Sequence, residues 1–469
     1  MKLIKDRSFY KQTFAIALPL ALQNLITIIT NLADSLMLGN SDFAEVGMPA
    51  VAQANQPFFL LNMCCFGLAG GAMVLNSQYL GKGDWRAIRR VFAIVVKCGA
   101  VIGAAFTAVL LCFPKGVMSL YTGNAAEILA GADYLRIFAW GYLLFGCSAT
   151  MIFTLRSVEI VKLSVFVNLM SFCTNVFLNW VLIFGNLGAP ALGIRGAAIA
   201  TLVARALEFL AVYVYVFFVD KKLAFRPHHV LKWDRLLVRD LFRYGTPVLL
   251  NEVIFGLGMS LQAVILGHIP NTAGYVSETM GNPVTANTIS SMVQQLSTLF
   301  IFGVANAAAV LVGRAVGEGD RELARRRAHT FRVLGYVIGA VCSLTIILLR
   351  PFILNLYAEV HGSTRELASQ LVLVTAFIAF FISTSAISIV GSLRGAGDTK
   401  FCFFTEVCTM WCVALPLAAC GAFIFSFPVW LVLFCMKIDE PLKAVVCIFR
   451  LRGKRWIRSV TRDFDDAKE

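Results

Sequence analysis

Two carboxylates stand inside long apolar stretches of this sequence, where a charged group is costly. Asp34 lies in NLADSLMLG and Glu252 lies in TPVLLNEV, and neither has a Lys or Arg within one helical turn. Ionisable residues in such surroundings usually belong to ion or substrate pathways. A lone carboxylate there can take up and release a proton, coordinate Na⁺ together with neighbouring oxygen atoms, or attract an organic cation. We therefore predict that both residues act in ion coupling or transport.

Four further polar side chains recur in apolar segments at helical spacing. Asn175 and Asn179 are four residues apart and therefore share one helix face. They fit two roles equally well: hydrogen bonds between helices, or oxygen ligands that complete a Na⁺ site at Asp34. Arg205 and Glu208 are three residues apart, so we predict a structural ion pair that neutralises both charges inside the membrane.

Two prolines stand near the predicted carboxylate sites. Pro19 precedes Asp34 by 15 residues, and Pro247 precedes Glu252 by five. A proline inside a helix removes one backbone hydrogen bond and favours a kink. Bending at Pro19 and Pro247 could therefore change the surroundings of the two carboxylates during transport, and the alternative is a static kink.

The composition shows what kind of protein must position these residues. Of the 469 residues, 58% are apolar or aromatic and only 14% are charged, against about 25% charged in soluble domains. The mean hydropathy is +0.76. These values exclude a disordered chain, a coiled coil and an ordinary cytosolic enzyme. Neither a nucleophile–base pattern nor a Cys/His metal spacing is present, so we expect no enzyme activity, no resident metal and no cofactor beyond a coupling ion.

Apolar stretches of 18 or more residues recur along the whole chain and predict an all-α polytopic membrane protein. We predict twelve transmembrane helices. The last is the least apolar, because it contains Lys437, Asp439, Glu440 and Lys443, and part of it is expected to lie at the interface. The predicted spans are 13–38, 48–78, 91–112, 134–154, 165–188, 194–219, 241–267, 285–313, 331–349, 367–393, 401–424 and 427–448.

The basic residues are distributed unevenly between the two sides of these spans. The two termini and alternate loops hold 32 of the 41 Lys and Arg residues, whereas the opposite loops hold five. Positively charged loops remain in the cytoplasm, so both termini are predicted to be cytoplasmic in a multi-pass plasma-membrane protein. The net charge of +14 then faces anionic membrane lipid, and we expect no nucleic-acid partner.

Two loop motifs occur twice. GKGDWRAIRR at 81–90 corresponds to GEGDRELARR at 317–326, and LRSVEIVK at 155–162 corresponds to LRGAGDTK at 393–400, at offsets of 236 and 238. In the first motif, Gly would end one helix in a left-handed conformation and Asp would cap the next. The duplication predicts two parallel six-helix repeats. Their predicted limits are 1–220 and 241–449, with a basic linker at 221–240 and a basic tail at 450–469.

The sequence resembles the multidrug and toxic compound extrusion (MATE) family, of the NorM and DinF type. The stretches that carry the resemblance span essentially the whole chain, in order and duplicated. They are LPLALQNLITIITNLADSLMLG, SQYLGKGD, NVFLNWVLIFG, LGIRGAAIAT, TPVLLNEV, GVANAAAVLVGRAVGEGD and SLRGAGDTK.

This resemblance implies two six-helix lobes that form a V around a cavity. It also implies export of cationic, amphipathic drugs or toxins in exchange for H⁺ or Na⁺ by alternating access. Pro19 and Asp34 match the kinked proline and acidic residue of the family's first span, and Glu252 and Asn175 match its polar residues in spans 7 and 5. Position 179 is Asn where some members have Asp.

An alternative within the same superfamily is a flippase for lipid-linked saccharides. Such a protein needs basic side chains inside the cavity to hold a pyrophosphate, and only Arg205 qualifies in this sequence. The leading hypothesis is therefore a secondary antiporter for small organic cations, which we expect to be a monomer.

Overall fold

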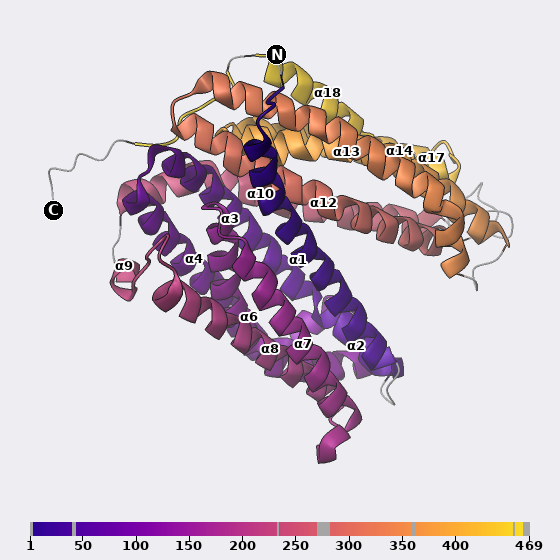
Figure 1. The fold of residues 1–469 in the computed structure, drawn as a ribbon. Helices are drawn as coiled ribbons and strands as arrows, with labels where there is room; N and C mark the ends of the chain where they lie inside the picture. Colours follow the sequence, from indigo (N-terminus) through magenta and orange to yellow (C-terminus); the bar gives the residue numbers. More distant parts are fainter. Residues whose placement is uncertain are drawn as a thin grey trace. The chain divides into compact units, whose positions relative to one another are not determined.

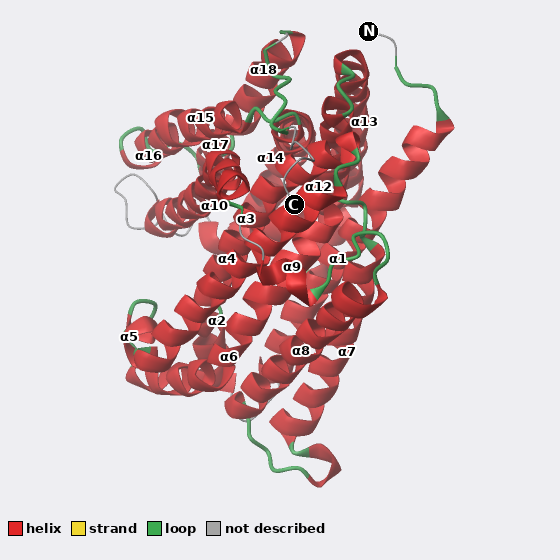
Figure 2. Ribbon diagram, turned by 90° about the vertical axis from the view of Figure 1, so that its left-hand side faces the viewer, coloured by secondary structure: helices red, strands yellow, loops and turns green. Residues whose placement is uncertain are grey.

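The computed structural model describes residues 3–39, 44–231, 234–269, 282–357, 362–453 and 455–462. Within these ranges every regular element is a helix, as Figure 2 shows. Eleven of the described helical segments are long and apolar enough to cross a membrane. The predicted all-α polytopic fold is therefore confirmed.

The chain forms two compact units, each described here by itself. The N-terminal unit contains Pro19–Asn76 and Gly83–Leu249. It holds most of α1 (Arg7–Gly39), α2 (Ala44–Ala54), most of α3 (Gln56–Lys82), α4 (Trp85–Cys112), α5 (Pro114–Ser119), α6 (Ala125–Arg156), α7 (Lys162–Phe184), the 3₁₀ turn η1 (Asn186–Gly188), α8 (Ile194–Val214), the π-helical turn η2 (Tyr215–Val219), α9 (Pro227–Leu231) and the first part of α10 (Arg235–His268).

The C-terminal unit contains Met1–Leu18, Ser77–Lys82 and Leu250–Glu469. It holds the rest of α10, α12 (Pro283–Gly317), α13 (Arg321–Leu356), α14 (Gly362–Ala386), the π-helical turn η4 (Ile387–Leu393), α15 (Thr399–Thr409), the π-helical turn η5 (Met410–Ala414), α16 (Leu415–Phe423), α17 (Val429–Met436) and α18 (Asp439–Arg452).

The compact units do not coincide with the predicted sequence halves. The chain passes from one unit to the other within α1, between Leu18 and Pro19, and within α10, between Leu249 and Leu250. Both helices contain an internal proline, Pro19 in α1 and Pro247 in α10. The predicted linker at 221–240 also contains regular structure, namely α9 and the start of α10.

The last predicted span, 427–448, consists of two short helices. α17 and α18 have eight and 14 residues and are separated at Lys437 and Ile438. Neither alone reaches the roughly 20 residues that a straight crossing requires. The break occurs where the charged residues of this segment begin.

In the N-terminal unit α4 packs along α6, and α6 and α7 each pack along α8 (Figure 1). Glycines permit the close approach of α4 and α6. A Cβ atom on Gly99 would lie 2.5 Å from the carbonyl oxygen of Gly146, and one on Gly146 would lie 2.5 Å from that of Gly99. Small residues allow membrane helices to pack backbone to backbone, where van der Waals contact replaces the hydrophobic effect.

A second close contact between α4 and α6 has a counterpart in the C-terminal unit, between α13 and α14. A Cβ atom on Gly103 would lie 2.8 Å from the carbonyl oxygen of Tyr142, and one on Gly339 would lie 2.8 Å from that of Phe380. Gly103 and Gly339 are 236 residues apart, and Tyr142 and Phe380 are 238 residues apart. These are the two offsets that separate the duplicated loop motifs. The repeat therefore includes helix packing as well as loops.

We expect Gly99→Ala to destabilise the N-terminal unit by about 1–3 kcal/mol, because the added methyl group would force two backbones apart. The matched control is Gly267→Ala in α10, where no described atom outside the adjoining helix backbone lies within 4 Å of the added Cβ. There the substitution should be neutral or stabilising, since alanine favours helix more than glycine does. Thermal unfolding of the purified variants in detergent measures the difference, and equal midpoints would contradict the close-packing argument.

The first loop motif has the predicted geometry in both halves. Gly83 and Gly319 have φ angles of 75° and 79°, the left-handed conformation that favours glycine. Asp84 Oδ1 accepts a hydrogen bond from Ala87 N at 2.9 Å, and Asp320 Oδ1 accepts one from Leu323 N at 2.8 Å. The prediction of a glycine turn followed by an aspartate cap is confirmed.

Candidate functional site

The N-terminal unit brings Asp34 together with the two predicted asparagines. Asp34 lies on α1, and both asparagines lie on α7. Asn179 is 145 residues from Asp34 in the sequence. Asn179 Nδ2 donates a hydrogen bond of 2.6 Å to Asp34 Oδ1 and one of 3.2 Å to Asn175 Oδ1. Asn175 Nδ2 in turn donates to Thr201 Oγ1 on α8 at 3.3 Å.

This cluster presents oxygen atoms beside a carboxylate. Asn175 and Asn179 are 3% and 1% exposed, and Asn179 Oδ1 is buried without a hydrogen-bond partner in the part of the chain that the structure describes. A buried acceptor without a donor is rare and is satisfied when a proton donor or a cation arrives. Carboxylate, amide and hydroxyl oxygens are the ligands that hard cations prefer. The arrangement thus suits uptake of H⁺ or Na⁺.

Arg205 and Glu208 form the ion pair that their spacing predicts. Arg205 Nη1 lies 2.5 Å from Glu208 Oε2, and Glu208 Oε1 accepts a hydrogen bond of 3.0 Å from Ser148 Oγ on α6. The Arg205 guanidinium lies 5.3 Å from the ring centroid of Phe145 and interacts electrostatically with Asp34. The pair is therefore structural and also contributes to the field at Asp34, which the sequence did not indicate.

Loss of either member of this pair should reduce stability by about 3–5 kcal/mol, because it strands a charge in a medium of low dielectric constant. We expect Arg205→Met and Glu208→Gln each to lower the unfolding temperature more than the double variant does. A double-mutant cycle on thermal unfolding gives the coupling free energy. Simple additivity of the two single changes would rule out the proposed pairing energy.

The prediction that Glu252 is an unpaired carboxylate is wrong. Glu252 Oε1 lies 2.8 Å from Arg394 Nη1, and the side chains of Glu252 and Arg394 are 13% and 7% exposed. Arg394 belongs to the second loop motif, 142 residues away, so no local spacing could reveal the pair. The charge of Glu252 is already balanced, which removes the physical reason for assigning a cation to it.

The equivalent arginine in the N-terminal unit has a neutral partner. Arg156 corresponds to Arg394 in the duplicated motif, and its Nη2 donates a hydrogen bond of 2.7 Å to Gln23 Oε1 on α1. In each half, the first long helix therefore binds the arginine of the second loop motif. The partner is an amide in one half and a carboxylate in the other.

A buried charge cluster that was not predicted from the sequence surrounds Lys443 in the C-terminal unit. Lys443 Nζ lies 2.6 Å from Glu440 Oε1, 3.0 Å from Asp439 Oδ2 and 3.3 Å from Glu406 Oε1. Its side chain is 3% exposed. Ser385 Oγ also donates a hydrogen bond to Glu440. The density of charges in 437–443 is the signal that the sequence contains, but by itself it predicts a segment at the membrane interface and not a buried cluster.

The model of the MatE family matches residues 19–181 and 273–420, about two thirds of the chain. The chain belongs to the MatE family. Its members are transporters, so this MatE protein is a membrane transporter and not an enzyme.

Two curated relatives cover most of this MatE chain. It is 29% identical over 432 residues to the probable multidrug resistance protein NorM of Bradyrhizobium diazoefficiens, covering 88% of this chain and 87% of the relative. It is 26% identical over 419 residues to the probable multidrug resistance protein NorM of Thermotoga maritima, covering 87% of this chain and 84% of the relative. The fold matches a solved outward-facing multidrug resistance MATE transporter of the MOP superfamily, with a TM-score of 0.83 and 16% identity over 97% of this chain and all of that one.

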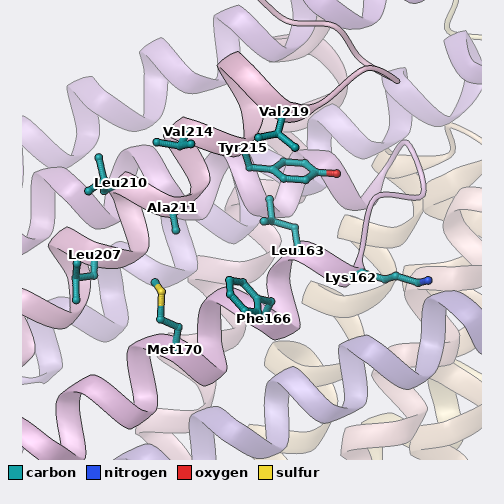
Figure 3. A pocket seen from close by; sticks show the side chains of 10 residues that line it. All are labelled: Lys162, Leu163, Phe166, Met170, Leu207, Leu210, Ala211, Val214, Tyr215 and Val219. Carbon is teal, nitrogen blue, oxygen red and sulfur yellow. The ribbon is translucent and has the colours of Figure 1, made fainter.

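A cavity of about 680 Å³ lies between α7, α8 and η2 of the MatE protein (Figure 3). Apart from Lys162 and the hydroxyl of Tyr215, its lining is apolar, and Phe166 and Leu210 are more than half exposed. None of the predicted site residues lines it. Exposed apolar side chains on a membrane helix face the lipid, so we interpret this cavity as part of the lipid-facing surface.

The described residues contain no group of three or more His, Cys, Asp or Glu side chains that could hold a metal ion. A Na⁺ site at Asp34 would instead draw on amide and hydroxyl oxygens. In a transporter that ion is cargo and enters and leaves in every cycle.

Proposed function

We propose that this protein exports cationic, amphipathic drugs or toxins in exchange for H⁺ or Na⁺ by alternating access. The observation that carries the proposal is the Asp34 cluster: a carboxylate on α1 held by Asn179, next to a buried amide oxygen that has no hydrogen-bond partner in the described part of the chain. The names of the two NorM relatives support multidrug resistance as the biological setting.

The charge of Asp34 explains why an organic cation would be exchanged for H⁺ or Na⁺. An ionised carboxylate inside the membrane attracts a cation strongly, because the low dielectric constant screens it poorly. Binding of H⁺ or Na⁺ cancels that negative charge and with it the attraction for an organic cation. The inward-moving ion and the outward-moving organic cation therefore exclude one another electrostatically, which is the requirement for coupled antiport. Pro19 and Pro247 are proposed to permit the helix bending that accompanies the cycle.

Dye uptake into inside-out vesicles under imposed gradients tests the proposal, because the cytoplasmic face of the transporter points outward in them. A Na⁺ gradient at constant pH, with K⁺ as the replacement ion, and a pH gradient without Na⁺ are applied separately. We expect one of the two gradients to drive transport of a cationic dye and the other to have little effect. Transport that responds to neither gradient would refute ion-coupled export.

Glu252 is proposed to balance Arg394 and not to bind the transported cation. Glu252→Gln should therefore leave the affinity for a cationic dye unchanged, while lowering the free energy of unfolding by about 1–3 kcal/mol through loss of a charged hydrogen bond. In the other half the amide of Gln23 accepts a hydrogen bond from Arg156, so an amide partner for this arginine is compatible with folding. Fluorescence polarisation of a cationic dye with the purified variant measures the affinity. A large loss of affinity would show that Glu252 does bind the transported cation.

The flippase alternative has less support. It requires a free basic side chain for a pyrophosphate, but Arg205 is neutralised by Glu208 at 2.5 Å. Arg156 is 6% exposed and is engaged by Gln23 at the end of α6. The cytoplasmic location of both termini and the monomeric state remain predictions from the sequence.

A further inference from the structure

A second pocket, of about 350 Å³, lies in the C-terminal unit where the first turns of α13 approach the end of α18. Its polar lining is entirely basic or aromatic. α13 contributes Arg325, His329 and Arg332, and the segment that ends α18 contributes Arg452 and Trp456. No carboxylate of the described part of the chain lines it, and none of these residues belongs to the Asp34 cluster.

Three buried nitrogen atoms in this lining have no hydrogen-bond partner among the residues that the structure describes. They are Arg332 Nε, Trp456 Nε1 and His329 Nδ1. Trp456 is 1% exposed, so water at the surface does not satisfy its indole N–H. The arginine and tryptophan nitrogens can only donate, so what the pocket lacks is an acceptor. Buried donors that lack partners are rare in folded proteins, and two in one pocket, beside a histidine nitrogen that can also donate, indicate an absent ligand.

The charges specify the ligand further. Arg332 and Arg452 have no ion-pair partner among the described residues, and Arg325 Nη1 lies 3.9 Å from the half-exposed Glu322. A ligand for this pocket must therefore carry negative charge and several acceptor oxygens directed at different donors. A phosphate group has both properties and binds the guanidinium group with paired hydrogen bonds.

The position of the pocket along the helix favours a phosphate at the membrane surface. Arg325, His329 and Arg332 are four, eight and 11 residues past the start of α13 at Arg321, which places them about 6–17 Å along the helix. Basic pockets between helices on the cytoplasmic side bind lipid headgroups, and the basic loops of the sequence predict that the start of α13 lies on that side. We propose that this pocket binds the phosphate of an anionic ligand, supplied by a phospholipid headgroup or by free phosphate.

The test uses the full-length purified protein in nanodiscs. Native mass spectrometry measures retention of phosphatidylglycerol against phosphatidylcholine, and a thermal shift with inorganic phosphate measures binding of the free ion. Arg332→Gln with Arg452→Gln should reduce retention of phosphatidylglycerol about tenfold. Arg321→Gln with Arg326→Gln removes two charges from α13 outside the pocket and serves as the matched control. Trp456→Phe keeps the ring and removes only the indole donor.

Loss of phosphatidylglycerol in the pocket variants but not in the control supports a lipid headgroup as the source. A phosphate-dependent thermal shift that disappears in the same variants, without selective lipid retention, supports the free ion. Equal losses in the control would show that general surface charge is responsible and would overturn the proposal. Unchanged binding in both the double variant and Trp456→Phe would overturn it as well.

Discussion

Asp34→Asn is expected to abolish ion-coupled efflux while leaving the protein folded. The substitution keeps the shape of the side chain and a hydrogen bond to Asn179 remains geometrically possible, but the charge that a coupling ion must neutralise is lost. Transport of a cationic dye should fall by at least about a hundredfold, because the coupled step requires that charge. Dye uptake into inside-out vesicles, driven by the active gradient, provides the measurement.

The control for Asp34 is Asp133→Asn. Asp133 is another carboxylate of the N-terminal unit, and it pairs with Arg195 at 2.6 Å on the exposed surface. Its loss should cost at most about 1 kcal/mol of stability and leave transport unchanged. Efflux at the wild-type rate from a well-expressed Asp34→Asn protein would exclude Asp34 as the coupling residue.

Lys443→Met should be the most destabilising single substitution of a side chain in the C-terminal unit. It would leave Glu406, Asp439 and Glu440 close together without the cation that contacts all three at 2.6–3.3 Å. Breaking a buried ion pair costs about 3–5 kcal/mol, because the remaining charge is neither solvated nor compensated. We expect a large fall in the unfolding temperature, measured by differential scanning fluorimetry.

A second substitution separates this electrostatic effect from simple loss of packing. Adding Glu440→Gln to Lys443→Met removes one stranded carboxylate and should recover part of the lost stability. Lys400→Met, an exposed site on α15, should have little effect. If Lys443→Met unfolds at the wild-type temperature, or if Glu440→Gln adds to its damage, the charge cluster does not stabilise the unit in the way that its geometry indicates.

The features that the sequence determined are local ones. Apolar runs of the right length predict membrane helices because crossing the hydrocarbon demands about 20 apolar residues whatever the tertiary structure is. The Arg205–Glu208 pair follows from a three-residue spacing on one helix, and the Gly83–Asp84 turn follows from the conformations that glycine and a capping aspartate favour. The duplicated motifs predicted the repeat, which the glycine contacts of α4 and α13 extend.

Only the tertiary structure decided which distant residues meet. Asp34 and Asn179 are 145 residues apart, and Glu252 and Arg394 are 142 apart, yet both pairs form hydrogen bonds. Sequence periodicity shows which face of a helix a residue occupies but not which helix packs against that face. Glu252 therefore seemed to lack a counter-charge until the fold brought Arg394 to it. The basic pocket at Arg332 has the same origin, because it collects side chains from α13 and from the end of α18. In the cluster at Lys443 the fold adds Glu406, 37 residues away, to charges that are already neighbours on α18.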